Sequence, residues 1–283
     1  RQPDQKLDYT MSPTKAEFRR QIASGKVLYS TMLSMTRNPR WLEMMATLDF
    51  DFITIDTEHS PYSWGEVSDL ISVLNAHGIP PVIRMPRPSS EYVSRLFDQG
   101  AYGILAPYCE NLDDIRDIVR AARLRPMKGE FARRAFDEDS WPSDDTKNHL
   151  AEYNEGHVVM IGVESVPAAE NIENILDIGG IDAVFIGPAD MTTSMGIPRD
   201  FDHPRFDEMV RHIVSVCKSH QVQVAVNFQG WEHAAKWGSQ GVSLLIHAFD
   251  YRVLHAAYRR DLENIANAIG DKSKIIAETD AHI

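Results

Sequence analysis

Residues 52–85 decide the fold. Residues 52–56 read Phe-Ile-Thr-Ile-Asp, residues 63–66 read Ser-Trp-Gly-Glu, and residues 81–85 read Pro-Val-Ile-Arg-Met. The first and third segments are short apolar runs, which is typical of strands buried on both faces. The second is a helix-capping box, and apolar residues three and four positions apart follow it up to Gly78. This order predicts a strand, a helix and a parallel strand.

The same alternation recurs along most of the chain. Eight runs are predicted as strands: Val27–Leu33, Phe52–Asp56, Pro81–Met85, Tyr102–Pro107, Val158–Glu164, Ala183–Gly187, Val222–Phe228 and Val242–His247. Amphipathic segments separate them and are predicted as helices: Ser12-Pro13 to Gly25, Ser63 to Gly78, from Ser89 or Ser90 to Gly100, from Asn111, from Pro167, around Phe206–Ile213, and Asp250–Ile269.

Eight strands alternating with helices predict an α/β protein with a closed (β/α)8 TIM barrel. The alternative is an open, doubly wound sheet. That fold normally carries a glycine-rich phosphate turn after its first strand, whereas residues 31–35 read Thr-Met-Leu-Ser-Met. We therefore expect one barrel domain over residues 1–283, with its core at about 27–269.

Composition excludes several classes of protein. Of the 283 residues, 43% are hydrophobic and 25% charged, as in globular domains. There are 29 Lys and Arg against 41 Asp and Glu, so the net charge of −12 argues against binding to nucleic acid or an anionic membrane. No run is long enough to span a membrane, and the first thirty residues do not resemble a signal peptide. With only Cys109 and Cys217, we expect a cytoplasmic protein without disulfides.

One long interval, residues 123–157, interrupts the alternation. Long connections in compact domains are commonly lids, binding loops or linkers. We therefore expect either a lid or subunit contact near the barrel mouth, or a solvated excursion with a short helix near Thr146–Tyr153.

Polar residues close most of the predicted strands. Active sites of TIM barrels lie at this end of the strands. The residues at or just after the strand ends are Asp56, His59, Arg84, Tyr108, Glu164, Asp190, Asn227 and His247. No lysine ends a strand after the first, which argues against a Schiff-base aldolase, and the chain has no nucleophile elbow, phosphate loop or His-Glu-x-x-His helix.

Glu164 and Asp190 are the candidate metal ligands. Two carboxylates on neighbouring strand ends, without a Cys or His cluster, suit a hard divalent cation such as Mg²⁺, which fills its other positions with water and substrate oxygens. Mn²⁺ or Co²⁺ could substitute. The alternative is that both carboxylates simply cap the helices that follow.

His59 and Arg84 are the candidate catalytic residues. A histidine just past a barrel strand can serve as a general base, although an ordinary loop histidine is the alternative. An arginine that ends a buried strand needs a partner, which is either a barrel carboxylate or a substrate carboxylate. The alternative to an enzyme is a barrel that binds a metabolite or a partner protein without catalysing a reaction.

Four motifs resemble those of one family, the HpcH/HpaI aldolases, which are metal-dependent pyruvate aldolases. Residues 55–61 (Ile-Asp-Thr-Glu-His-Ser-Pro) are similar to the family's "IDxEHxP" stretch, and residues 82–84 (Val-Ile-Arg) to its "VxR" strand. Residues 163–165 (Val-Glu-Ser) resemble its glutamate strand end. Residues 186–191 (Ile-Gly-Pro-Ala-Asp-Met) resemble its "IGPxDL" signature, with Met191 for Leu. The resemblance extends over roughly Val27 to Ile269.

The resemblance implies a role for each matching residue. Glu164 and Asp190 hold the metal, on which a small oxo-acid chelates through its carboxylate and 2-oxo oxygens. Arg84 stabilises the enolate oxygen, and His59 is the base, acting through a water on the metal. The Ala189-Asp190 backbone contacts the substrate carboxylate. An aspartate that assists the family's base falls on Asp98. A helix from Ser90 carries Asp98 about 12 Å below the barrel mouth, so it could reach a base only across a subunit interface.

The activity implied is a divalent-metal-dependent carbon–carbon lyase that forms or captures pyruvate enolate from 4-hydroxy-2-oxo acids or oxaloacetate. A homo-oligomer, a trimer or hexamer, is also implied. Two departures matter: Gly162 replaces a substrate-binding glutamine and is expected to widen the pocket, and Phe131 stands at an arginine position of a loop motif. Tyr108 falls where the macrophomate synthase branch has a histidine. The alternative function is therefore an oxaloacetate decarboxylase that adds the enolate to a larger acceptor such as a pyrone.

Overall fold

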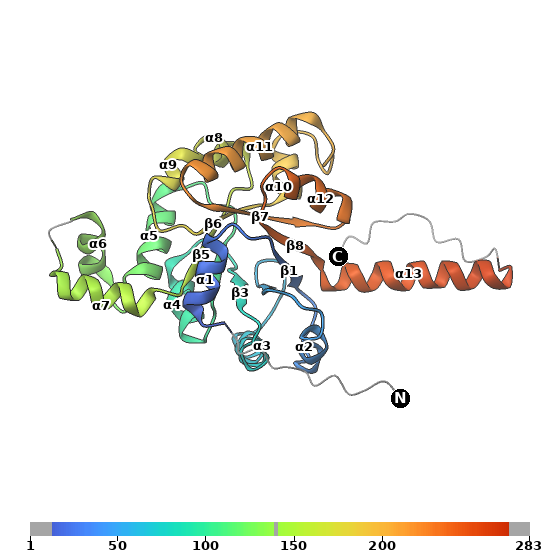
Figure 1. The fold of residues 1–283 in the computed structure, drawn as a ribbon, viewed down its shortest axis with the longest axis horizontal. Helices are drawn as coiled ribbons and strands as arrows, with labels where there is room; N and C mark the ends of the chain where they lie inside the picture. The colour runs from blue at the N-terminus through green and yellow to red at the C-terminus, as the bar shows by residue number, and fades with distance from the viewer. Residues whose placement is uncertain (1–12, 139–140, 272–283) are drawn as a thin grey trace.

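Eight parallel strands close into a barrel (Figure 1). The structure is a computed structural model that describes residues 13–138 and 141–271. The strands are β1 (Leu28–Leu33), β2 (Ile53–Asp56), β3 (Pro81–Arg84), β4 (Gly103–Ala106), β5 (Val158–Gly162), β6 (Ala183–Ile186), β7 (Gln223–Phe228) and β8 (Leu244–Phe249). They follow one another in sequence order around the barrel, and β8 pairs with β1. The predicted (β/α)8 TIM barrel is confirmed.

Helices connect the strands and surround the barrel. In the described residues they are α1 (Lys15–Ala23), α2 (Arg40–Met45), α3 (Trp64–Ala76), α4 (Ser90–Asp98), α5 (Leu112–Arg123), α6 (Gly129–Asp137), α7 (Asp144–Asn154), α8 (Val166–Glu170), α9 (Ile172–Leu176), α10 (Pro188–Ser194), α11 (Pro204–Ser219), α12 (Trp231–Ser239) and α13 (Asp250–Ile269). The capping box of α3 is confirmed, because Ser63 Oγ accepts from the Glu66 N–H and Glu66 Oε2 accepts from the Ser63 N–H. Ser89 caps α4 and Asn111 caps α5, as predicted.

Three predicted elements differ from the structure. The helix expected from Pro167 is two short helices, α8 and α9, that meet at Asn171. The strand expected over Val242–His247 lies two residues later, because the Val242 N–H bonds to Trp237 O in the turn that ends α12. The first helix is capped by Thr14, and Ser12 lies outside the described residues.

The inside of the barrel is filled, and α1 closes its N-terminal end. Phe18 and Ile22 of α1 are fully buried, and Phe18 packs on Phe52 with ring centroids 5.8 Å apart. Together with inward-facing residues such as Met160 and Phe185, they form one apolar cluster. Removing a large buried side chain of this kind costs about 3–5 kcal/mol. Because α1 closes one end, access to polar groups is at the carboxyl ends of the strands.

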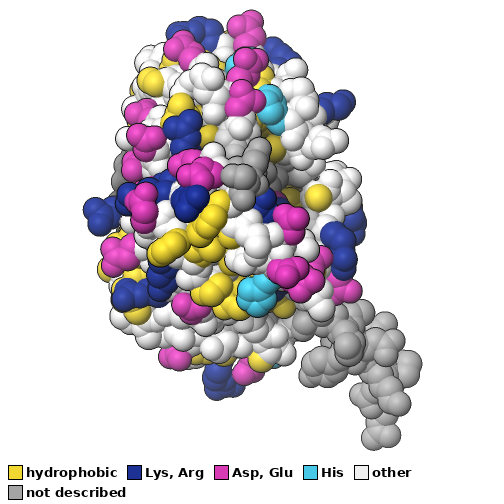
Figure 2. All heavy atoms as spheres, turned by 90° about the vertical axis from the view of Figure 1, so that its left-hand side faces the viewer, with side chains coloured by type: hydrophobic (Ala, Val, Ile, Leu, Met, Phe, Trp, Pro, Cys, Tyr) yellow, Lys and Arg dark blue, Asp and Glu magenta, His cyan; other side chains and the backbone are white. Residues whose placement is uncertain are grey.

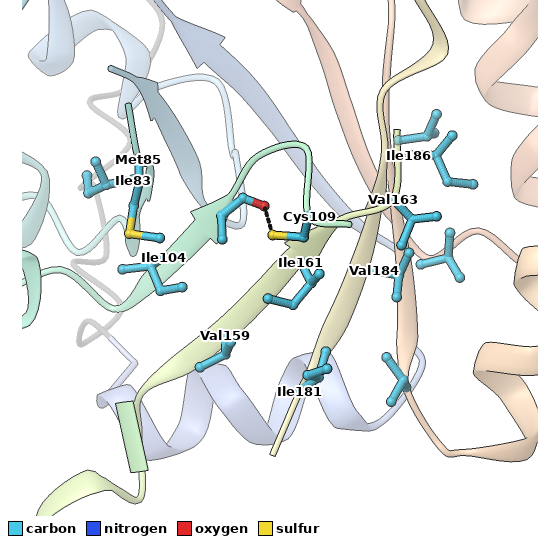
Figure 3. Close-up of a cluster of buried hydrophobic side chains, with 14 of the residues drawn as sticks. Ile83, Met85, Ile104, Cys109, Val159, Ile161, Val163, Ile181, Val184 and Ile186 are labelled. Atoms are coloured by element: carbon cyan, nitrogen blue, oxygen red, sulfur yellow. Dashed lines mark hydrogen bonds between the residues drawn. The ribbon is translucent and has the colours of Figure 1, made fainter. Parts of the chain in front are cut away.

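A second, larger apolar layer lies between the strands and the helices. Figure 3 shows part of it, with Ile83, Ile104, Ile161 and Val184 projecting from β3 to β6. Cys109 belongs to this layer, and its Sγ lies 3.4 Å from Ala106 O. Both cysteines are buried and free, so the prediction of a chain without disulfides is confirmed.

The interval 123–157 forms two helices, α6 and α7, beside α5. α7 includes the predicted short helix near Thr146–Tyr153. Asn154 anchors the segment, because its Nδ2 donates to the carbonyls of Arg123 and Arg125. Such hydrogen bonds to main-chain groups fix the end of α7 against the barrel body.

Helix α13 extends away from the barrel (Figure 1). Asp250 and Ala266 are its buried residues. Its N-terminus is held by the Asp250 carboxylate, which accepts from the main-chain N–H groups of Ser34, Met35 and Thr36 after β1. No helix within residues 13–138 and 141–271 is long and apolar enough to cross a membrane.

Candidate active site

An ion pair links the ends of β2 and β3. Asp56 and Arg84 are register partners on these strands. The guanidinium meets the carboxylate in two places, with Arg84 Nε 2.8 Å from Asp56 Oδ1 and Nη2 2.7 Å from Oδ2. Burial alone would lower the pKa of Arg84, but the hydrogen bond and charge of Asp56 raise it above its ordinary value. The predicted barrel partner of Arg84 is therefore Asp56, and the arginine is a fixed cation at the barrel mouth.

Glu58 lies between Arg84 and His59. Its Oε2 is 3.2 Å from Arg84 Nη1 and 3.5 Å from His59 Nε2. The Asp56 carboxylate accepts from the main-chain N–H of Glu58 at 3.0 Å, which orders the turn after β2. Burial raises the pKa of Glu58, and the charges of Arg84 and His59 oppose this rise. The His59 side chain is 62% exposed, so one face of its ring is open to solvent or substrate.

Glu164 is a buried carboxylate directly after β5. It is 2% exposed, and its Oε1 accepts from the Tyr108 N–H at 2.9 Å. Tyr108 has a φ of 45°, a left-handed conformation, in the turn that follows β4. Burial raises the pKa of Glu164 to about 7, against the hydrogen bond from Tyr108 and the charge of Arg84. The carboxylates of Glu58 and Asp190 contribute smaller parts of this rise.

Two glycines make room for this carboxylate. A Cβ on Gly187 would lie 2.1 Å from Glu164 Oε2, and a Cβ on Gly162 would lie 2.3 Å from Oε1. Real non-bonded contacts are never that short, so each glycine leaves space that the carboxylate fills. The expectation that Gly162 widens the pocket is wrong, because Glu164 fills the space above it. Instead, Gly162 and Gly187 form a seat for Glu164.

Asp190 lies in the first turn of α10, after β6. The N-cap of α10 is Gly187, which makes no side-chain cap hydrogen bond, and the N-cap of α8 is Ser165. Neither Glu164 nor Asp190 therefore caps the helix that follows it. Capping does not explain why these two carboxylates stand at the ends of β5 and β6.

One cavity of about 820 Å³ at the barrel mouth brings most of the predicted residues together. His59, Arg84, Glu164, Ala189 and Asp190 all line it. Tyr108 and Gly162 are not lining residues and instead support Glu164 from behind. No described residue of 123–157 lines the cavity either.

Asp98 lies away from this cavity, at the last residue of α4. Its carboxylate pairs with Arg125, which is almost fully buried. The Asp98 side chain itself is 69% exposed. Within one chain Asp98 is thus at the opposite end of the barrel from His59, as the helix geometry predicts.

The outer part of the cavity was not foreseen in the sequence. It is lined by the last residues of β7 and β8 and by residues that follow β1, β6, β7 and β8: Met35, Arg37, Arg199, Phe201, Phe228, Gln229, Glu232, His233, Trp237, Phe249, Tyr251 and Arg252. Asn227, which was noted as a strand end, also lines it. The only sequence signal for these residues is that they come soon after the ends of strands. Because α12 has no capping side chain, the sequence does not show that a helix begins there and brings its residues to the barrel mouth.

The residues suited to hold a cation are Glu164 and Asp190, which supply oxygen ligands to the same cavity. Among the described residues, no group of three or more His, Cys, Asp or Glu side chains forms a site of its own. The seat formed by the two glycines points one buried carboxylate into the cavity beside a second one. This donor set fits a hard divalent ion that completes its coordination with substrate and water oxygens.

Comparisons with known proteins identify the family of the chain. A "2-keto-3-deoxy-L-rhamnonate aldolase" of Klebsiella pneumoniae is 30% identical over 242 residues, which is 83% of this chain and 88% of that protein. The crystal structure of an HpcH/HpaI aldolase from Desulfitobacterium hafniense DCB-2 has a TM-score of 0.76 at 26% identity and covers 88% of this chain and 96% of that one. The crystal structure of macrophomate synthase shares the fold, with a TM-score of 0.72 at 20% identity over 93% of both chains. The sequence profile described as HpcH/HpaI aldolase/citrate lyase matches residues 30–254. The chain accordingly belongs to the HpcH/HpaI aldolase/citrate lyase family.

Proposed function

We propose that this protein is a metal-dependent carbon–carbon lyase that cleaves 4-hydroxy-2-oxo acids and releases pyruvate. The observation that carries the proposal is the seat of Glu164. A carboxylate with a pKa near 7 is held by two glycines beside Asp190, in the same cavity as the fixed cation Arg84. Buried carboxylates with raised pKa values are typical of functional sites.

Glu164 and Asp190 would hold the divalent ion, with Mg²⁺ as the first expectation and Mn²⁺ or Co²⁺ as substitutes. When bound, the ion would supply positive charge next to the 2-oxo oxygen of the substrate. Burial is the main reason for the raised pKa of Glu164 and the charge of Asp190 adds to it, so a bound cation would stabilise the charged form of both carboxylates. Class II aldolases generally depend on divalent metals, and the identity of the ion here is part of the proposal.

Arg84 would stabilise the enolate oxygen. Its two contacts with Asp56 fix the guanidinium before substrate arrives, and stabilisation by such a preorganised group costs no reorganisation in the transition state. In the cleavage direction, a base removes the C4 hydroxyl proton, the C3–C4 bond breaks, and its electrons move to the C2 oxygen. Protonation at C3 then gives pyruvate. His59, exposed at the rim and close to Glu58, is the proposed base.

The remaining predicted residues would have supporting roles. The backbone of Ala189 and Asp190, at the start of α10, would contact the substrate carboxylate. Tyr108 would act through its N–H on Glu164. Gly162 would act as part of the seat.

A second candidate is an oxaloacetate decarboxylase that adds the enolate to a larger acceptor such as a pyrone. The observation in its favour is the size of the cavity, about 820 Å³, which exceeds the needs of a small aldehyde. Both reactions pass through pyruvate enolate, so they share Glu164, Asp190 and Arg84. Cleavage of a 4-hydroxy-2-oxo acid requires removal of the C4 hydroxyl proton, whereas decarboxylation of oxaloacetate does not.

We also propose a cytoplasmic homo-oligomer, a trimer or hexamer. Helix α13 carries an exposed apolar stripe, and such surfaces mark interfaces. The stripe consists of Leu254, Tyr258, Leu262, Ile265 and Ile269.

A subunit contact is likewise our proposal for residues 123–157, where Phe131 is 65% exposed and stacks on Trp141. Figure 2, which views the side of α6 and α7, shows hydrophobic side chains among interspersed acidic and basic ones. Asp98 would come close to a catalytic base only in such an assembly, across the interface with another subunit.

The test is a metal-dependence assay on the purified full chain. After removal of metal with EDTA, Mg²⁺ or Mn²⁺ is restored and pyruvate is followed from oxaloacetate and from 4-hydroxy-2-oxopentanoate. We expect metal-dependent pyruvate from the hydroxy-oxo acid. Pyruvate from oxaloacetate alone would favour the second candidate, and no pyruvate from either would overturn the enolate chemistry.

A further inference from the structure

A second histidine lines the cavity besides His59. His233 lies on α12, which follows β7, and Asp190 lies on α10, which follows the neighbouring β6. Both side chains line the same cavity. His233 therefore stands one β–α unit away from the proposed metal ligand and lines the same cavity.

Aromatic rings hold His233 in place. Its ring stacks on Trp237 with centroids 5.2 Å apart and an interplanar angle of 24°, and Phe201 meets it edge-on at 6.0 Å. His233 Nε2 lies 3.5 Å from an Asp202 oxygen. A carboxylate on one ring nitrogen places the proton there and leaves the other nitrogen as a hydrogen-bond acceptor.

The other nitrogen, Nδ1, faces Gly230. A Cβ placed on Gly230 would lie 3.8 Å from Nδ1, so a side chain at position 230 would cover this edge of the ring. Gly230 also lines the cavity. Within residues 13–138 and 141–271 no hydrogen bond to Nδ1 is formed, and the His233 side chain is 25% exposed. The His233 side chain is thus partly accessible from the cavity that it lines, next to the Glu232 carboxylate.

We propose that His233 binds the part of the substrate beyond C4, by accepting a hydrogen bond at Nδ1 from a hydroxyl group there. This inference rests on the proposed function. It narrows the substrate class, the 4-hydroxy-2-oxo acids, to those with a further hydroxyl group that can reach His233. The preferred substrate carries a hydroxyl group that enters the space between α10 and α12. His233 contributes to recognition of the aldehyde-derived part and takes no part in forming the enolate.

The test compares two reactions of the same enzyme. Cleavage of 4,5-dihydroxy-2-oxopentanoate involves a hydroxyl group beyond C4, whereas exchange of the pyruvate methyl protons with D₂O needs only enolate formation. His233→Phe keeps a ring between Trp237 and Phe201 but removes Nδ1. His233→Asn keeps a polar group near the Nδ1 position. His212→Phe, on the exposed face of α11, is the matched control. Each variant is assayed with Mn²⁺, and its circular dichroism and Tm are recorded.

For His233→Phe we expect the ratio of cleavage kcat/KM to exchange rate to fall about 10- to 100-fold, as for an unpaired hydrogen-bonding group. His233→Asn should recover part of this ratio, and His212→Phe should match the wild type. Equal loss of both reactions in His233→Phe, or no loss in either, would overturn the inference while leaving the proposed function intact. A wild-type enzyme that neither exchanges nor cleaves would overturn both.

Discussion

Replacing Gly187 by alanine tests whether the seat of Glu164 matters for metal binding. The three atoms nearest to the added Cβ would all belong to Glu164, with Oε2 the nearest at 2.1 Å. Non-bonded heavy atoms approach to about 3.5 Å, so the oxygen must move by about 1.4 Å. Metal–ligand distances tolerate only about 0.2 Å, and the carboxylate would therefore leave the geometry that the ion requires. The backbone of Gly187 has a φ of −90°, which alanine adopts freely.

The expected result is a loss of metal affinity of about 10- to 100-fold, the range found when groups that position a ligand are changed. Titration calorimetry with Mn²⁺ measures the affinity, and pyruvate release measures activity at saturating metal. Gly65→Ala is a matched control, because its Cβ would lie 3.9 Å from Ser63 Oγ in ordinary contact. If Gly187→Ala bound Mn²⁺ as tightly as the wild type and Gly65→Ala, the reasoning about the seat would be refuted.

Three further changes have defined outcomes. Because burial raises the pKa of Glu164 to about 7, the folded protein binds more protons than the unfolded chain between about pH 4.5 and 7. The stability of the metal-free protein should therefore fall as pH rises through this range, by up to about 3 kcal/mol in urea unfolding, and Glu164→Gln should remove the fall. Arg84→Lys should lower kcat by about 10²- to 10³-fold with little change in KM, since a lysine cannot keep both contacts with Asp56, and steady-state kinetics measures this. Leu262→Glu combined with Ile265→Glu should reduce the mass found by light scattering to that of a smaller assembly, and an unchanged mass would exclude α13 from the interface.

The apolar runs predicted the strands well, because strands of a closed parallel barrel are buried on both faces. The predicted bounds differ from the structure by one or two residues. The largest shift is in β8, where the register against β1 changes between Thr31 and Met32. An irregularity of this kind depends on how two distant strands meet, and the local sequence does not carry it.

Side-chain caps marked several of the predicted helices, whereas α13 was predicted from its length and pattern and has no such cap. α3 begins at Ser63 and α5 at Asn111, and both were expected. α6, α10 and α12 were missed, and each begins at a residue whose side chain makes no cap hydrogen bond: Lys128, Gly187 and Gly230. Without the cap signal, a short helix with few buried residues resembles a loop in the sequence.

The inner site was predictable because its residues stand at strand ends, which meet at one mouth of a barrel. The seat of Glu164 was not predictable. It depends on Gly162 and Gly187 lying on either side of the carboxylate, from two strands. The position of His233 was likewise set by packing among aromatic rings from α12 and the loop before α11.

A crystal structure of the protein with Mn²⁺ and pyruvate tests the central claim most directly. We predict an anomalous peak at the barrel mouth, with carboxylate oxygens of both Glu164 and Asp190 within about 2.0–2.3 Å and two pyruvate oxygens on the same ion. An ion bound elsewhere, or one that leaves either carboxylate turned away, would contradict the account.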